Sequence, residues 1–361
     1  MKICLFTSGR QDWGLLEKLA AEISMREGLT LQIIATGGHL SLLHGRTIDH
    51  IKYPVDAALP VVLAEDSRAA NAKGAGMLMM DLPPVLERLA PDVLVLLGDR
   101  FETCAAAQVA KLMGVKIAHI HGGERTGHWD DAFRWAISHM ADVHFPATKT
   151  AAFALAVDVI IGRGDKADIF ECGCLGADGV SKWQPNSQRY KTFKSCSLVY
   201  HPMMEEPEDL IDKIYDSVRE SCGFNMLIGP NFDAGFFKLK RLEEKAQDSL
   251  YWGYLQREEF LIELSKADFL IGNSSSGIIE APAMGIPSVN IGSRQDGREK
   301  AKSVIDCEPT EEAISAAIDK ALSREFIESI KGQELYYKGE NVAHKMVNCL
   351  VEWHREQNAH N

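Results

Sequence analysis

Short hydrophobic runs alternate with longer amphipathic segments along the first half of the chain. Runs of mostly apolar residues recur as KICLF, LQIIAT, DVLVLLGD, KIAHIH and DVHFPAT. Segments with helical spacing of apolar positions, such as WGLLEKLAAEIS and AGMLMMDLPPVLERLA, lie between them. Strands without polar alternation are typical of sheets buried on both faces, so this order predicts a parallel sheet with helices on each side.

The same pattern starts again in the second half, where SLVYH, NMLIG, DFLIG and PSVNIG have the character of strands. Glycine and turn residues gather in ECGCLGADG, from Glu171 to Gly179, and indicate a boundary. A chain of 361 residues also suits two domains better than one. We predict an α/β protein with two Rossmann-like doubly wound domains facing a cleft, residues 1–172 and 173–344, and a C-terminal helix, 345–361, that packs back on the N-terminal domain.

Composition and charge limit the classes of function that the protein can have. The net charge of −12 argues against a nucleic-acid surface, so an anionic substrate must be held locally by backbone amides and placed arginines. No apolar run approaches the roughly 18 residues of a membrane helix, and the N-terminus lacks a secretory pattern, so we expect a cytoplasmic protein with no membrane partner. The eight cysteines are scattered, and Cys172-Gly-Cys174 lacks zinc-site spacing, so neither disulfides nor a metal is expected.

Ligands of doubly wound sheets bind beyond the carboxyl ends of the strands, so residues that directly follow the apolar runs are candidates. No GxGxxG, GxxxxGK[ST] or GxSxG motif occurs there, which leaves a bound dinucleotide poorly supported. The candidate segments are Ser8–Asp12, Gly37–His39, Gly98–Arg100, His121–Glu124, His201-Pro202, Pro230–Asp233 and Gly272–Gly277.

The segment GNSSSGIIEAPAMGIPSVNIGSRQDGR carries the strongest signal for an anion. A strand there leads into a Gly/Ser turn and then a helix expected from about Ser276, which brings amides and hydroxyls together. The alternative is that the serines only cap the helix. Glu280 lies one turn further and suits ribose hydroxyls better than phosphate. The candidate phosphate ligands are Ser274, Ser275, Gly277, Arg294 and Arg298.

Acid/base candidates gather at the ends of the first-half strands. Asp99 ends a nearly all-apolar strand, where desolvation would favour its protonated form and suit it to proton transfer; a salt bridge to Arg100 is the alternative. His119 lies within its strand and is expected to be a core residue. His121 and Glu124 stand at that strand's end, and one of Asp130 and Asp131 is expected to cap the next helix. His201 is a further candidate that ends a second-half strand.

Seven motifs in order together resemble the UDP-N-acetylglucosamine 2-epimerase family, especially its hydrolysing branch, which makes N-acetylmannosamine or related sugars for sialic-acid-like nonulosonates. The resemblance spans most of the chain. It is carried by SGRQDWGLL, LLGDRFETCAAA, AHIHGGERTG, DDAFRWAISHMADVHF, GADGV, HPM and GNSSSGIIEAPAMGIPSVNIGSRQDGR.

The resemblance assigns expected roles to the strand-end residues. It places Arg10 and Asp12 at a nucleotide-sugar contact, Asp99, Asp130 and His201 in catalysis, and Ser274, Ser275, Glu280 and Arg294 at UDP. His121 stands where many relatives carry glutamate before the paired glycines, and Glu124 could take that role instead. The segment between His201 and Gly272 looks shorter than in relatives, although PNFDAG resembles a family turn.

The family's chemistry implies a UDP-N-acetylhexosamine substrate, a glycal intermediate, release of UDP and inversion at C2. It implies no cofactor and a homodimer, for which the apolar helix GMLMMDLPPVLERLA could supply the interface. The C4 and C6 substituents of the sugar stay open. The alternatives are a non-hydrolysing epimerase, a glycosyltransferase with the similar GT-B arrangement of two domains, and an inert UDP-sugar-binding protein.

Overall fold

The protein divides into two compact units in a computed structural model. The model describes residues 1–61, 67–161, 168–183, 194–203, 206–207, 209–229, 235, 237–239, 242, 251–252 and 255–359. Unit 1 consists of Met1–Arg125, Trp129–Asp178 and Lys338–Asn361, and unit 2 consists of Thr126–His128 and Gly179–Tyr337.

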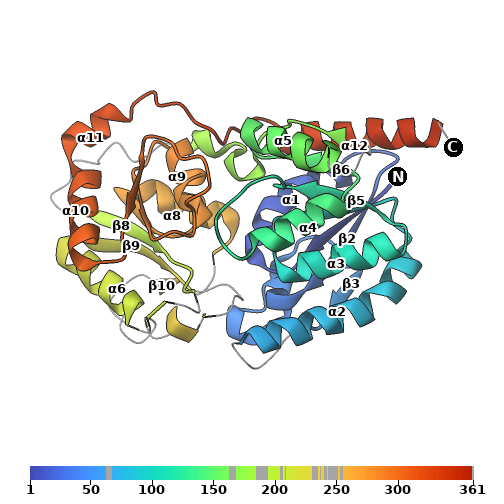
Figure 1. Ribbon diagram of the computed structural model, residues 1–361, viewed down its shortest axis with the longest axis horizontal. Helices are drawn as coiled ribbons and strands as arrows, with labels where there is room; N and C mark the ends of the chain where they lie inside the picture. Colours follow the sequence, from blue (N-terminus) through green and yellow to red (C-terminus); the bar gives the residue numbers. More distant parts are fainter. Residues whose placement is uncertain are drawn as a thin grey trace. The chain divides into compact units, whose positions relative to one another are not determined.

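The described part of unit 1 forms a seven-stranded parallel sheet in the order β3-β2-β1-β4-β5-β6-β7 (Figure 1). The chain moves outward from β1 in one direction and then, from β4, in the other, which makes the sheet doubly wound. The gap between the ends of β1 and β4 is therefore its topological switch point. The strands are β1 (Lys2–Thr7), β2 (Thr30–Thr36), β3 (Ala57–Leu59), β4 (Val93–Leu97), β5 (Lys116–Ile120), β6 (Val143–Phe145) and β7 (Asp168–Ile169).

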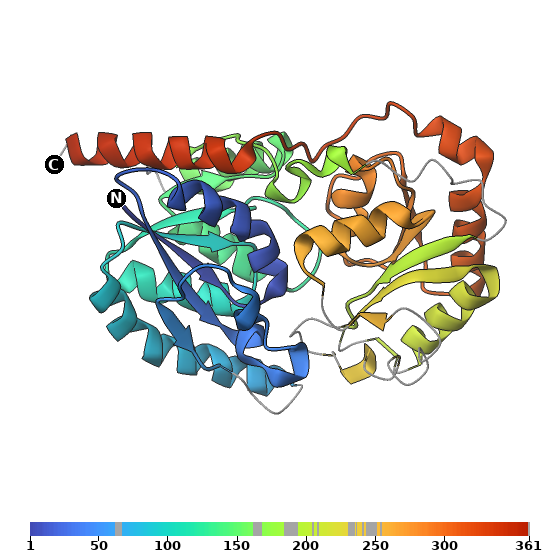
Figure 2. The same ribbon diagram turned by 180° about the vertical axis from the view of Figure 1, so that it is seen from behind.

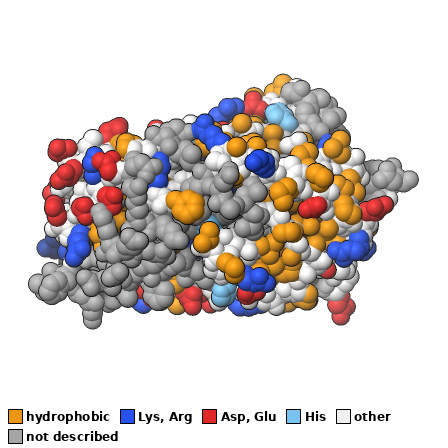
Figure 3. Space-filling view, turned by 90° about the horizontal axis from the view of Figure 1, so that it is seen from below, with side chains coloured by type: hydrophobic (Ala, Val, Ile, Leu, Met, Phe, Trp, Pro, Cys, Tyr) orange, Lys and Arg blue, Asp and Glu red, His pale blue; other side chains and the backbone are white. Residues whose placement is uncertain are grey.

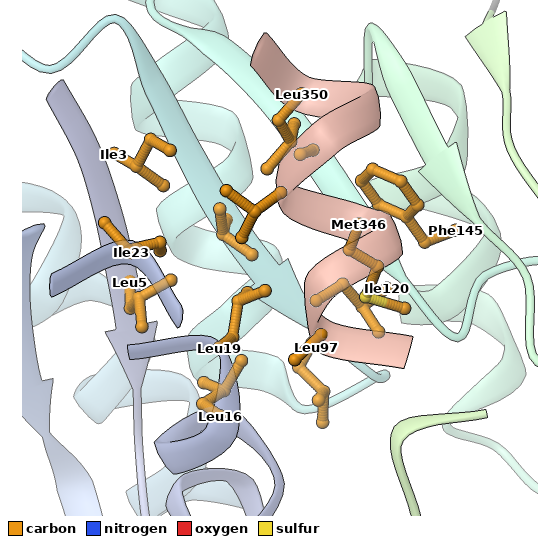
Figure 4. Packing of buried hydrophobic residues seen from close by; sticks show 14 of the residues in the cluster. Ile3, Leu5, Leu16, Leu19, Ile23, Leu97, Ile120, Phe145, Met346 and Leu350 are labelled. Atoms are coloured by element: carbon orange, nitrogen blue, oxygen red, sulfur yellow. The ribbon is translucent and has the colours of Figure 1, made fainter. Parts of the chain in front are cut away.

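Helices cover both faces of this sheet because successive strand residues point to opposite sides. On one side Ile3 and Leu5 pack against α1 (Arg10–Ser24) and the C-terminal α12 (Val342–Ala359), as Figure 4 shows. Figure 2 shows these two helices lying next to each other. On the other side Cys4 and Phe6 belong to a second core. That core is covered by α2 (Arg68–Leu89), α3 (Phe101–Leu112) and α4 (Asp131–Met140), and α5 (Lys149–Leu155) follows β6.

The described part of unit 2 repeats the plan with a parallel sheet in the order β10-β9-β8-β11-β12-β13. Its switch point lies between β8 and β11. One core contains α6 (Leu210–Ser221) and α10 (Glu311–Leu322), the other α8 (Arg257–Lys266) and α9 (Glu280–Ala283), and α11 (Arg324–Ser329) follows α10. The strands are β8 (Ser195–Val199), β9 (Gly223–Ile228), β10 (Tyr251–Trp252), β11 (Phe269–Gly272), β12 (Ser288–Ile291) and β13 (Val304–Cys307).

The predicted fold class, two doubly wound parallel sheets, is confirmed, whereas the division of the chain differs in detail. It falls after Asp178 and before Lys338 rather than after residues 172 and 344. Leu175 is buried in the first core, Cys174 N–H donates to Lys338 O at 2.8 Å, and Asp178 Oδ2 accepts the Val342 N–H at 3.2 Å. The glycine-rich segment is thus tied to unit 1. None of the described helices is both long enough and apolar enough to cross a membrane.

Candidate active site

The loop after β1 at the switch point of unit 1 is held by Asp12. Its Oδ2 accepts the Ser8 N–H at 2.8 Å and the Ser8 Oγ–H at 2.7 Å, and its side chain is buried in the first turn of α1. Arg10 begins the same helix and is half-buried. Asp12 therefore shapes the loop that presents Arg10.

A buried arginine organises the carboxylates after β4 and β5. The Arg134 side chain is only 2% exposed. It forms ion pairs with Asp99 and, through Nη1 at 3.3 Å, with Glu124, and its Nε lies 4.0 Å from Asp131. A buried guanidinium is stable only with charged partners, which these carboxylates supply. Arg134 was not among the residues predicted from the sequence, although it shares the buried face of α4 with Ile137.

Two expectations for Asp99 need correction. The side chain is not fully desolvated, since it is 25% exposed, and its arginine partner is Arg134 from a distant helix. The neighbouring Arg100 pairs with Glu102 at 3.1 Å. Arg134 thus holds the Asp99 carboxylate in place while part of it stays open to a ligand.

The backbone at His121 is held in an unusual conformation. Its φ is 62°, in the left-handed region that histidine tolerates better than most non-glycine residues. The His121 N–H donates to Phe145 O at 2.9 Å, and His121 O accepts from Arg134 Nη1 at 2.8 Å. The imidazole Nε2 lies 3.6 Å from the buried Cys174 Sγ. The two backbone hydrogen bonds fix the His121 main chain and join it to Arg134, so His121 and the ion pairs of Arg134 form one set.

Asp130 takes the N-cap position of α4, but its side chain makes no capping hydrogen bond. Asp131 is the first residue of the helix. The prediction that one of the two is the N-cap is confirmed for Asp130, although its side chain makes no capping bond. Its carboxylate, half-buried, does not serve the helix end.

His119 is a core residue, as predicted. Its ring lies 3.0 Å from Ser138 Oγ through Nδ1 and 2.8 Å from Gly98 O through Nε2. Burial lowers the pKa of His119 from 6.5 to about 3, with Arg134 and His144 adding to the effect. The imidazole is neutral at physiological pH and supports the end of β4.

Acid is expected to destabilise the protein through His119. Below its ordinary pKa of 6.5, the unfolded chain takes up a proton that the folded protein, with a pKa of about 3, does not. The contribution to stability is therefore full above pH 6.5 and is reduced by about 2 kcal/mol at pH 5. Urea unfolding at pH 7 and 5 should show a smaller loss for His119→Asn than for the wild type. Equal losses would contradict this origin.

Asn273 joins three strand ends at the switch point of unit 2. Its Oδ1 accepts the His201 N–H at 2.7 Å, and its Nδ2 donates to His201 O at 2.9 Å. Its own carbonyl accepts from Arg294 Nη1 at 3.1 Å and from the buried Gln295 at 2.9 Å. Gly272 just before it has φ 144°, and a Cβ there would overlap Val199 O. The loops after β8, β11 and β12 are thereby locked together.

The serine turn differs from its prediction. Ser275–Gly277 is a short 3₁₀ turn, and the helix expected from Ser276 begins only at Glu280. Ser274 caps this turn, because its Oγ accepts from Ser276 N–H at 3.3 Å and Ser276 Oγ–H at 3.0 Å. Gly277 is required for packing, since a Cβ would lie 2.6 Å from Ser288 Oγ. Of the three serines, Ser275 is the least buried.

The two remaining arginine candidates lie on the loop after β12. Both Arg294 and Arg298 are half-buried, and Arg298 Nη1 donates to Gln295 Oε1 at 3.1 Å. Gln295 in turn donates to Asn273 O, so the arginine loop and the serine turn share one network. The candidates at Pro230–Asp233 lie outside the described residues.

Doubly wound sheets with a polar set at each switch point define a two-domain α/β protein of the Rossmann class. A family model described as UDP-N-acetylglucosamine 2-epimerase matches residues 21–351. The chain belongs to this family, which confirms the resemblance.

Two curated relatives agree with this assignment. The chain is 34% identical over 341 residues to a "UDP-N,N'-diacetylbacillosamine 2-epimerase (hydrolyzing)" of Legionella pneumophila, covering 90% of this chain and 89% of the relative. It is 30% identical over 348 residues to a "GDP/UDP-N,N'-diacetylbacillosamine 2-epimerase (hydrolyzing)" of Campylobacter jejuni, covering 90% and 88%. The crystal structure of UDP-GlcNAc 2-epimerase from Neisseria meningitidis bound to UDP-GlcNAc shares the fold, with a TM-score of 0.78, 17% identity and coverage of 98% and 100%.

Proposed function

We propose that the protein is a hydrolysing 2-epimerase that acts on a UDP-N-acetylhexosamine and releases UDP and the C2-inverted sugar. The observation that carries the proposal is the Arg134 set, which gathers Asp99, Glu124 and His121 at strand ends in a chain of this family. The names of the Legionella and Campylobacter relatives support the hydrolysing reaction and point to UDP-N,N'-diacetylbacillosamine as a substrate to test beside UDP-N-acetylglucosamine.

The first stage is an elimination. A base removes the C2 proton, the electron pair forms the C1–C2 double bond, and UDP leaves from C1. We assign the base to Asp99, because it follows β4 at the switch point and its carboxylate, 25% exposed, is open to a ligand. His121 or Glu124 is the second proton-handling group. Glu124 is nine-tenths buried and lies beside the same guanidinium, whereas His121 offers an imidazole, the side chain most often used as a general acid or base.

The second stage adds water to the glycal and returns a proton to C2 on the opposite face. Two faces require two groups, and we assign this stage to Asp130 together with His121 or Glu124. His201 lies at the switch point of unit 2 beside Asn273 and suits stabilisation of the departing phosphate. No cofactor takes part in this scheme, and the product would serve the synthesis of sialic-acid-like sugars.

UDP binding is assigned to unit 2. Ser275 Oγ, the Gly277 turn and the guanidinium groups of Arg294 and Arg298 suit the diphosphate. Ser274 supports the turn rather than binding directly. Arg10 suits an additional contact to the nucleotide-sugar, with Asp12 supporting its loop.

One experiment separates this proposal from its rivals. The purified protein is incubated with UDP-N-acetylglucosamine and with UDP-N,N'-diacetylbacillosamine in deuterated water, and the products are identified by NMR. We expect free UDP and a free sugar with deuterium at C2. A mixture of C2-epimeric UDP-sugars would indicate a non-hydrolysing epimerase. A substrate that stays intact until an acceptor is added would indicate a glycosyltransferase. Binding of UDP without turnover would indicate a binding protein.

We also propose a cytoplasmic homodimer. Free cysteines are typical of a reducing compartment. The face of unit 1 in Figure 3 carries many hydrophobic side chains, and Met77 and Met80 of α2 are 40% and 78% exposed. Leu112 at the end of the neighbouring α3 is 83% exposed. A second copy would bury this surface, and a monomeric mass in light scattering would overturn the dimer.

A further inference from the structure

The carboxylate of Glu280 has one paired and one unpaired oxygen. Glu280 begins α9, directly after the serine turn, and its side chain is 6% exposed. Its Oε1 lies 2.5 Å from Arg257 Nη1. Its Oε2 is buried and has no hydrogen-bond partner within the described part of the chain.

A buried carboxylate oxygen without a hydrogen bond destabilises the folded protein unless a ligand donates one to it. The missing partner must be a donor. A phosphate group is excluded as the partner because it would place two negative charges together. A neutral hydroxyl satisfies the oxygen without charge repulsion, and the ribose of UDP carries two adjacent hydroxyls. Because Glu280 adjoins the turn proposed to bind the diphosphate, a ribose hydroxyl is the donor within the proposed ligand that this position suits best.

Arg257 occupies a rigid place beside this carboxylate. It is the first residue of α8, directly after a capping box in which Gln256 N–H donates to Glu259 Oε2 at 2.9 Å. Leu261 and Leu264 anchor the helix in the core. The Arg257 side chain is 15% exposed. A planar guanidinium with a fixed backbone holds Oε1 and so sets the direction of Oε2.

We propose that Arg257 is a positioning residue that orients Glu280 so that its Oε2 accepts a ribose hydroxyl, which makes the site selective for ribonucleotides. This inference rests on the proposed binding of UDP. Arg257 acts through Glu280 and does not itself contact the nucleotide.

Calorimetric titration with UDP, 2′-deoxy-UDP and 3′-deoxy-UDP tests this role without requiring turnover. The wild type should bind UDP at least about tenfold more tightly than one of the deoxy analogues, since a hydrogen bond to a charged group is lost. In Arg257→Met this ratio should fall to within about twofold of unity. The matched control is Arg324→Met, the same change at an exposed arginine of unit 2, which should keep the wild-type ratio.

If Arg257 had a purely structural role, its replacement would weaken the binding of all three nucleotides equally and leave the affinity ratio unchanged. An unchanged ratio in folded Arg257→Met would therefore overturn this inference while the proposed function stands. If Arg257→Met does not fold, Arg257→Gln is the variant to test, because it keeps a donor but lacks the planar fork. It should show the reduced ratio, and a wild-type ratio in this variant would also overturn the inference. A wild type that does not bind UDP would overturn the proposed function as well.

Discussion

Asp99→Asn is expected to reduce the rate of UDP release by about a thousandfold at saturating substrate. The amide keeps the shape of the carboxylate and can still accept a hydrogen bond from Arg134, but it cannot take the C2 proton. UDP affinity should stay within about twofold, because Asp99 acts on the sugar and not on the nucleotide. Rates of UDP release and calorimetric titration with UDP give both quantities.

The same substitution elsewhere in the same sheet provides the control. Asp142 lies at the amino end of β6, where its Oδ2 accepts the Ile117 N–H at 3.0 Å. Asp142→Asn should keep turnover near the wild-type value. Normal turnover in Asp99→Asn would rule out Asp99 as the base. A loss confined to UDP affinity would instead give it a binding role.

The doubly wound sheets could be predicted because their central strands are long and apolar. A run such as DVLVLLGD is typical of a strand that is buried on both faces of a sheet. The edge strands β3, β7, β10 and β13 were not predicted. They are only two to four residues long and carry no clear pattern, because pairing with a neighbour, not the sequence, defines them.

Strand-end reasoning located single residues but not their partners. Asp99, His121 and His201 each follow an apolar run, so the switch-point rule was sufficient to find them. Arg134, the partner of Asp99, and Arg257, the partner of Glu280, lie on helices, where contact depends on which face packs inward. For Arg134 a signal existed, since a charged residue one turn before the buried Ile137 must be paired in the interior. For Arg257 no comparable signal exists, because the first turn of a helix is commonly polar.

The backbone conformations at the candidate site could not be predicted from the sequence either. The left-handed conformation of His121 depends on Phe145 and Arg134, which are distant in sequence. The serine turn was expected to lead directly into a helix. Instead Ser274 caps a 3₁₀ turn and α9 starts at Glu280, which gives Glu280 its place beside Arg257.

Arg134→Met is expected to have the largest combined effect. Removing the guanidinium leaves Asp99, Glu124 and Asp131 without their shared cation, and breaking a buried ion pair costs about 3–5 kcal/mol. Turnover should fall about a thousandfold or more even at temperatures where the variant is folded, because the carboxylates lose both their charge balance and their geometry. Urea unfolding and rates of UDP release measure the two effects separately.

A second substitution separates the structural role of Arg134 from its catalytic role. Glu124 is the most buried of the three carboxylates, so Arg134→Met combined with Glu124→Gln removes the buried charge that loses its contact with Arg134. The double variant should regain more than half of the lost stability yet stay inactive, since Asp99 still lacks the Arg134 guanidinium. Recovery of activity together with stability would show that Arg134 serves only to hold the fold. Additive losses of stability would show that Glu124 and Arg134 are not coupled.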